Sequence, residues 1–147
     1  MKVRIGFIKI HPDAAVPQYA TAGSSGFDFM ALFETRINPG ETKMIRTGLA
    51  VEIPEGFESQ VRPRSGLSLN TMLRVSNSPG TIDSDFRSEI MIILTNMAAP
   101  GEETENVYQE TIDSNSYLVQ AGDRVAQGVI QKVRQAEFVQ LQQLSAT

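Results

Sequence analysis

Short apolar segments separated by turn residues recur along the whole chain, and this pattern limits the fold more than any other feature. The first segment, residues 3–10, alternates apolar and polar side chains and ends at Pro12. Later segments are closed by turn signals such as Pro39-Gly40. Segments of this length and spacing are typical of sandwiches and barrels, and not of alternating strands and helices. The sequence therefore predicts an all-β fold.

One helix interrupts this pattern. It is expected to begin at Ser65, with the Ser65 hydroxyl as N-cap before Leu67 and Leu69. The expected strands lie within residues 3–10, 26–32, 37–63, 89–96, 123–133 and 136–141.

The composition describes one domain of residues 1–147 and excludes several functions. A net charge of −4 argues against broad binding to nucleic acid or to anionic membranes. The chain has no cysteine, so it has neither disulfides nor thiolate metal sites. No run approaches the roughly 18 residues of a membrane span, and the first residues do not resemble a secretion signal. We therefore expect a protein of the cytoplasm or the nucleus that is not secreted.

An acidic segment between Asn96 and Gly122 differs from the rest of the chain. Its acidic residues are Glu102, Glu103, Glu105, Glu110 and Asp113, and it contains no basic residue. Turn signals at Pro100-Gly101 and after Asp113 predict an excursion that contains a hairpin. A solvated loop is the ordinary explanation for such a segment.

Two short motifs suggest an anion site, although each also has a purely structural explanation. A Gly- and Ser-rich run before Asp28 exposes backbone N–H groups, as an ordinary tight loop also does. Arg64 precedes a hydroxyl and a glycine at the expected helix start, where free N–H groups favour an anion. An N-capped helix with a surface arginine fits the same residues.

The aspartates Asp83 and Asp85 lie two residues apart in a turn that precedes an apolar strand. Because the chain has a single histidine and no cysteine, carboxylates are its available general bases. Carboxylates, hydroxyls and amides suit a hard Mg²⁺ ion and a phosphate substrate. One aspartate is therefore a candidate to polarise water in the hydrolysis of a phosphoanhydride.

Four motifs in order resemble those of the trimeric dUTP pyrophosphatase (dUTPase) family. They read AGSSGFD at 22–28, PRSGL at 63–67, NSPGTIDSDFRSE at 77–89 and GDRVAQ at 122–127. The resemblance implies a distorted jelly-roll β-sandwich or barrel with one short helix, assembled as a homotrimer. It also implies Mg²⁺-dependent hydrolysis of dUTP to dUMP and pyrophosphate, which keeps uracil out of DNA and supplies the precursor of dTTP.

The resemblance assigns roles to individual residues. Asp83 would activate the attacking water, while Asp85 would stabilise the turn. Asp28 would lie near the Mg²⁺ shell and act through water. The predicted substrate-binding residues are Arg64, Ser65, Gly66 and Gln127 for the phosphates, Asn77, Gly80, Thr81 and Ile82 for the uracil edge, and Phe86 for the deoxyribose.

The chain departs from the family pattern in several places. Phe86 replaces the usual tyrosine, and its ring is expected to keep the steric gate against ribose. Ser88 and Met72 stand where glycines are common. Family members usually end in a Gly-rich fifth motif that closes over a neighbouring subunit's site, and no stretch of this chain carries it. Either that tail has been lost or the enzyme works without it.

The segment 96–122 is an insertion atypical of the family. We expect it either to cover part of the site or a trimer surface, or to bind a protein partner through residues 97–121. Its acidic side chains would repel a triphosphate, so contact with the phosphates is not expected.

Two other functions are compatible with the motifs. A dCTP deaminase shares the fold, but that family places a glutamate near position 93, where this chain has isoleucine in an acid-free strand. A dUTP-binding regulatory protein with weak turnover would use the acidic segment as an interface. Retention of Asp83 argues against a pure binder, because binding alone needs no water-activating base.

Overall fold

The computed structural model of the chain describes residues 2–101, 103–105 and 111–146. Within these residues there are thirteen strands and one short helix, so the predicted all-β fold with one helix is confirmed. The helix is α1, Ser65–Asn70. The strands are β1 Gly6–Lys9, β2 Phe27–Met30, β3 Thr35–Ile37, β4 Thr42–Arg46, β5 Leu49–Glu52, β6 Phe57–Arg62, β7 Leu73–Val75, β8 Gly80–Ile82, β9 Met91–Asn96, β10 Glu103–Glu105, β11 Thr111–Asp113, β12 Tyr117–Val119 and β13 Arg124–Lys132.

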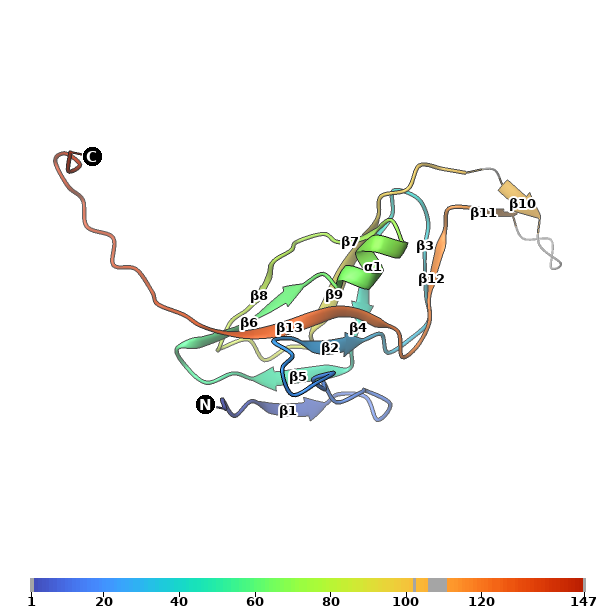
Figure 1. The fold of residues 1–147 in the computed structure, drawn as a ribbon. Coiled ribbons are helices and arrows are strands. Elements are labelled where there is room, and N and C mark those ends of the chain that lie inside the picture. The colour runs from blue at the N-terminus through green and yellow to red at the C-terminus, as the bar shows by residue number, and fades with distance from the viewer. Residues whose placement is uncertain (1, 102, 106–110, 147) are drawn as a thin grey trace.

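Two sheets form the body of the molecule (Figure 1). One has four strands in the order β2-β13-β6-β8, and the other has three in the order β4-β9-β7. Three pairs, β1-β5, β12-β3 and β10-β11, complete the arrangement. Every pairing is antiparallel, and the sheets of the described residues do not close into a barrel.

The hydrophobic core lies between the inner faces of these two sheets. Strand β9 shows why, because its residues alternate between buried and more exposed positions from Met91 to Asn96. This alternation sends Ile92 and Leu94 inward, and both are fully buried. They share one apolar cluster with Val61 and Ile82 of the four-stranded sheet.

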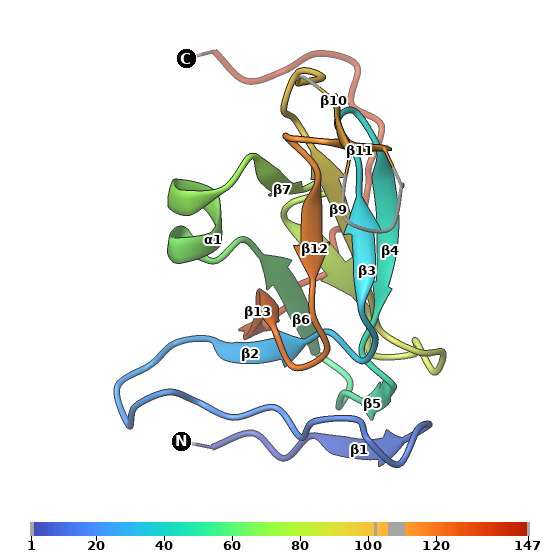
Figure 2. The same ribbon diagram turned by 90° about the vertical axis from the view of Figure 1, so that its right-hand side faces the viewer.

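The helix begins at Ser65, as predicted, but the predicted cap was wrong. Arg64 is the N-cap, with extended backbone angles of φ −95° and ψ 131°, and no side chain caps the helix. Ser65 is already the first helical residue, so its hydroxyl is not in the N-cap position. The helix lies outside the strands, beside β7 (Figure 2). In the described part of the chain, no helix has the length and apolar character needed to cross a membrane.

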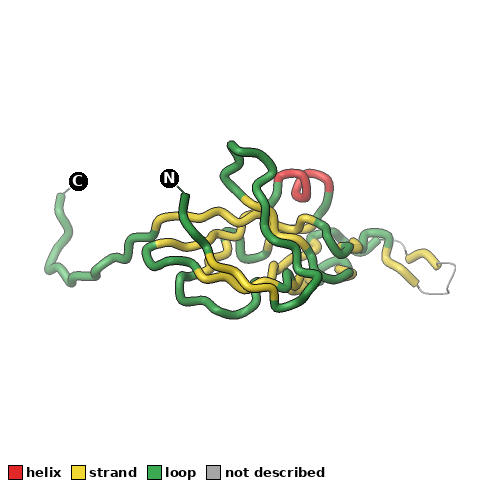
Figure 3. The backbone as a smooth tube through the Cα atoms, turned by 90° about the horizontal axis from the view of Figure 1, so that it is seen from below, coloured by secondary structure: helices red, strands yellow, loops and turns green. Residues whose placement is uncertain are grey.

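The strand predicted at 136–141 does not form. This segment follows β13 and extends away from the sheets (Figures 1 and 3). Its apolar side chains are open to solvent, and Phe138 is 95% exposed. A strand needs a hydrogen-bonding neighbour, and the described residues of this chain provide none here.

The hairpin predicted in the acidic segment is confirmed. Strands β10 and β11 pair with Glu103 opposite Asp113, and they lie at the end of the molecule opposite the C-terminal segment (Figure 3). The acidic side chains of this hairpin lie outside the described residues. The expected roles of 97–121, as a cover or as a partner-binding surface, therefore stay predictions.

Asn96 joins the base of this segment to the core. Its side chain is fully buried, and its amide donates to the carbonyls of Ile37 at 3.1 Å and of Asn115 at 2.8 Å. Its Oδ1 accepts the N–H of Ala98 at 3.0 Å. A short side chain therefore satisfies three backbone groups around the end of β9.

Replacing Asn96 by alanine should lower the free energy of unfolding by about 3 kcal/mol, because backbone groups lose their partners at a buried site. Urea denaturation measures this change. The control is Ser116→Ala, which removes the more accessible hydrogen bond to Asn38 and should change stability by less than about 0.5 kcal/mol. Equal losses in the free energy of unfolding would show that Asn96 stabilises the fold no more than Ser116 does.

Candidate functional site

Arg64 and Asp28 form the centre of the predicted phosphate site. The Nε of Arg64 donates to Oδ1 of Asp28 at 2.7 Å, and both side chains are largely buried, with 25% and 15% exposed. Since this bond uses Nε, the terminal Nη groups of Arg64 keep their N–H donors for a ligand. A guanidinium held in one orientation can donate two N–H groups to the oxygens of an anion such as phosphate.

Gln127 lies beside this pair because β13 runs between two other strands. It is opposite Asp28 of β2 on one edge and opposite Arg62 of β6 on the other. Its side-chain amide donates to the carbonyl of Pro63 at 2.8 Å, which fixes the segment before Arg64. Gly26 packs directly against this side chain, because a Cβ at position 26 would make Gln127 move.

Ser65 and Gly66 follow Arg64 in the first turn of α1, and both are exposed. Gly66 and Arg64 line an open depression of about 360 Å³ that also includes Arg124. The predicted phosphate residues are therefore neighbours in the folded chain. Their roles toward a ligand stay predictions.

Arg124 is a neighbour of this group that the sequence did not single out. Its Nη1 lies 3.7 Å from Oδ2 of Asp28, so two guanidinium groups approach one carboxylate. The preceding Asp123 accepts the N–H of Gln120 at 2.9 Å within a turn. The position of Arg124 in the GDRVAQ motif was the available signal.

The predicted uracil-binding residues occupy β8 and the turn before it. Gly80 is buried opposite Val61 of β6, and a Cβ on it would come within 3.1 Å of the Asn77 amide. Ile82 points into the core, so only its backbone is available to a ligand. Thr81 is exposed on the other face.

Asp83 follows β8 directly and is exposed in a turn. The N–H of Phe86 donates to the Asp83 carbonyl at 3.2 Å, and Arg87 donates to the carbonyls of Ser84 and Phe86 at 2.6 and 3.0 Å. Phe86 is 38% exposed. Asp83 lies in an open cleft of about 1090 Å³, which it shares with Asp85.

Asp83 and Arg64 are far apart within one chain. Ile82 pairs with Ser59, so Asp83 lies level with Glu58, while Arg64 comes six residues later along β6 and its extension. At about 3.3 Å per residue the two positions are roughly 20 Å apart. One copy of the chain therefore presents the candidate base and the candidate phosphate site at different places.

No group of three or more acidic or histidine side chains suited to a metal ion occurs within the part of the chain that the structure describes. The nearest carboxylate to the phosphate residues is Asp28, whose oxygens face Arg64 and Arg124. Hard oxygen donors of this kind fit Mg²⁺ when water and phosphate oxygens complete its shell.

Comparison with known proteins gives one family. The dUTPase family model matches residues 12–101. The deoxyuridine 5'-triphosphate nucleotidohydrolase of Helicobacter pylori J99 is 44% identical over 147 residues, which are 100% of this chain and 90% of that protein. The enzyme of the same name from Wolinella succinogenes is 40% identical over 146 residues, covering 99% and 88% of the two chains.

Solved structures agree. The dUTPase of phage phi11 of S. aureus, whose structure visualises a species-specific insert, has a TM-score of 0.88 at 24% identity, covering 98% and 99% of the two chains. The G164S mutant dUTPase of Staphylococcus bacteriophage 80alpha, solved with dUpNHpp, has a TM-score of 0.87 at 25% identity, covering 98% and 91%. The fold is therefore the jelly roll of these enzymes, and the chain belongs to the dUTPase family.

Proposed function

We propose that this protein is a dUTP diphosphatase, which hydrolyses dUTP to dUMP and pyrophosphate. The observation that carries the proposal is Asp83, an exposed carboxylate on a turn directly after β8, the predicted uracil-binding segment. The named activity of the relatives from H. pylori and W. succinogenes supports it. So does the 80alpha enzyme in complex with dUpNHpp, a dUTP analogue.

Asp83 acts as the general base. Its carboxylate accepts a proton from water as the water attacks the α-phosphorus, and the bond to the bridging oxygen of pyrophosphate breaks. A positioned base of this kind contributes about 10² to 10⁴ in rate. The exposure of Asp83 in an open cleft leaves room for the water and the substrate.

Arg64 neutralises the phosphates while Asp28 fixes its guanidinium. The exposed Ser65 and Gly66 offer a hydroxyl and a backbone N–H, and Gln127 holds the Pro63 segment in place. Bound Mg²⁺ supplies further positive charge to the triphosphate, with Asp28 as the carboxylate that would hold it through water. The phi11 enzyme has a structure that describes a structural Mg(II) ion.

The backbone of Gly80 and Ile82 and the amide of Asn77 recognise the uracil edge. Gly80 lies close to its neighbours, because a Cβ there would come within 3.1 Å of the Asn77 amide and 3.2 Å of the Val61 Cβ. Phe86 provides an apolar ring for the deoxyribose, and a 2′-hydroxyl there has no hydrogen-bonding partner on the ring.

The assembly is a homotrimer in which each site is shared between copies. The separation of roughly 20 Å between Asp83 and Arg64 supports this, because a second copy brings one copy's base to the other's phosphate residues. Exposed apolar side chains support it too, since Phe138 and Leu144 are 95% and 86% exposed in one copy.

Replacing Asp83 by asparagine should lower kcat for dUTP by about 10² to 10⁴, because the amide does not accept the proton of the attacking water. Pyrophosphate release measures the rate, and dUpNHpp binding should change little. A variant that keeps full turnover would exclude Asp83 as the base.

A mixing experiment tests the shared site. Arg64→Ala and Asp83→Asn homotrimers should each be nearly inactive, whereas trimers that contain both variants should recover roughly a third of the wild-type activity, because one of the three interfaces in each such trimer combines both intact residues. The copies are mixed by co-expression with two different tags. Mixed trimers without recovery would place both residues in the same copy's site.

Replacing Phe86 by alanine should raise turnover of UTP relative to dUTP by at least about tenfold, because the ring no longer excludes the 2′-hydroxyl. The control is Phe86→Tyr, which keeps the ring and should keep the discrimination. Unchanged discrimination in Phe86→Ala would assign the sugar selectivity to another group.

A further inference from the structure

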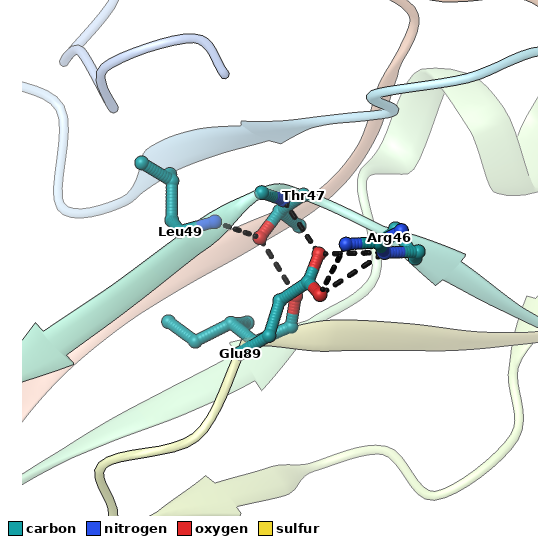
Figure 4. Close-up of polar contacts among 6 residues, drawn as sticks. Arg46, Thr47, Leu49 and Glu89 are labelled. Carbon is teal, nitrogen blue, oxygen red and sulfur yellow. Dashed lines mark hydrogen bonds and ion pairs between the residues drawn. The ribbon is translucent and has the colours of Figure 1, made fainter. Parts of the chain in front are cut away.

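Glu89 closes the turn that begins at Asp83, and its carboxylate is tightly held (Figure 4). The Nε of Arg46 lies 3.1 and 3.0 Å from its two oxygens, and Nη2 lies 3.0 Å from Oε2. The N–H of Gly48 donates to Oε1 at 2.8 Å. Only 9% of the Glu89 side chain is exposed.

Further hydrogen bonds, from the Thr47 hydroxyl and from the backbone, join the same two segments. The hydroxyl of Thr47 donates to the carbonyl of Ile90 at 2.7 Å, and the N–H of Ile90 donates to the carbonyl of Leu49 at 2.8 Å. The N–H of Leu49 in turn donates to the Thr47 hydroxyl at 3.3 Å. Residues 46–49 and 89–90 therefore form one hydrogen-bonded unit, which we call the Glu89 clasp (Figure 4).

The partners of Glu89 are themselves fixed. Gly48 has a φ of +69°, and a Cβ there would come within 2.9 Å of Ala14, so its backbone tolerates little change. The Arg46 guanidinium lies 5.6 Å from the centre of the Phe33 ring, which packs edge-on against His11. Both donors to Glu89 therefore have further contacts of their own.

The clasp is separate from the cleft around Asp83. Neither Glu89 nor Arg46 lines that cleft, while Asp83, Asp85 and Arg87 do. The other end of the turn is held by β8, where Ile82 pairs with Ser59. Residues 83–88 are therefore fixed at one end by a sheet and at the other by an ion pair.

The local charges favour an ionised Glu89. Burial alone would raise its pKa, but hydrogen bonds from Arg46 and Gly48, and the positive charges of Arg46 and His11, outweigh burial and hold the pKa below its ordinary range. Asp13 lies 3.8 Å from the His11 ring. The clasp is therefore intact at neutral pH.

We propose that Glu89 is a positioning residue, whose ion pair with Arg46 and bond to Gly48 hold the turn that carries Asp83 and Phe86. The catalytic consequence rests on the function proposed above, whereas the ordering of the turn does not. Glu89 acts through the backbone and touches no reacting atom. Losing the clasp lets the base move, and a displacement of 1 Å is enough to cost up to about a hundredfold in rate.

Glu41 provides a matched control. Its carboxylate pairs with Lys43 at 2.6 Å and accepts the N–H of Asn38 at 3.0 Å, so it also combines a cation with a backbone donor. Its pKa is likewise lowered, first by the hydrogen bond from Lys43 and then by that from Asn38. It lies in the turn before β4 and has no bond to residues 83–89 within the described part of the chain.

Hydrogen–deuterium exchange at residues 83–88 tests the ordering directly. Glu89→Gln and Arg46→Gln should each speed exchange there at least about tenfold, with the Phe86 amide as the main reporter because it donates to Asp83. Glu41→Gln should leave this segment unchanged. The double variant should resemble either single variant, because both changes break the same pair.

Steady-state kinetics with dUTP test the consequence. Glu89→Gln and Arg46→Gln should lower kcat at least about tenfold and raise KM by a smaller factor, while Glu41→Gln keeps both values. Normal exchange at 83–88 and normal kcat in the Glu89 and Arg46 variants would overturn the proposal, even if their stability falls. An inactive wild-type protein would instead refute the proposed function, and the exchange result would still decide whether Glu89 orders the turn.

The pH dependence follows from the direction of the pKa shift. Because the folded-state pKa of Glu89 is lowered, its ionised form stabilises the protein above the ordinary carboxyl range, and this contribution is lost as the pH falls through the folded-state pKa. The difference in Tm between wild type and Glu89→Gln should therefore be largest near neutral pH and shrink on acidification. A difference that is independent of pH would contradict an ionised clasp.

Discussion

Strand β13 pairs with β2 on one edge and with β6 on the other, and the positions of the candidate site residues follow from these two pairings. They bring Asp28, Gln127 and the residues after β6 together, so that Arg64 is held by a carboxylate. The next pairing, of β6 with β8, places Asp83 toward the opposite end of β6. The same sheet therefore assembles the candidate phosphate-binding residues and separates them from the candidate base.

This separation gives a physical reason for oligomerisation. A phosphoanhydride site needs its base and its phosphate ligands within a few ångströms of one substrate, and the sheet register of a single copy prevents that. In the proposed trimer, a second copy would supply the missing half without any change of register. The proposed trimer also offers a cover for the exposed apolar side chains after β13.

The sequence predicts those parts of the fold that depend on local patterns. The strand within 89–96 was predicted from its apolar run, and β9 forms there, although its alternation of buried and exposed positions is visible only in the structure. The helix start was predicted from Ser65 before Leu67 and Leu69, and α1 begins at Ser65. The predicted strand at 136–141 was wrong because an apolar run does not show whether a partner strand is present. The predicted Ser65 cap was wrong because Arg64, one residue earlier, has the extended backbone angles of an N-cap residue. These angles are a property of the folded backbone and cannot be read from the residue types.

The site shows the same limit. The four motifs, taken in the order in which they occur, identified Asp83, Arg64 and Gln127 as candidates. The hydrogen bond between Asp28 and Arg64 joins residues 36 positions apart, and it forms only because the sheet brings them together. The Glu89 clasp joins segments more than 40 residues apart, and neither Arg46 nor Gly48 belongs to a motif that suggests chemistry. Contacts that position a functional group therefore need the folded structure.

The central claim is selective hydrolysis of dUTP, and pyrophosphate release with Mg²⁺ from dUTP, dTTP, dCTP and UTP in parallel tests it most directly. The account predicts rapid release from dUTP and at least about a hundredfold lower kcat/KM for the other three, because the uracil and deoxyribose contacts act together. Tight binding of dUTP without pyrophosphate release, equal turnover of all four nucleotides, or release of ammonia from dCTP would contradict it.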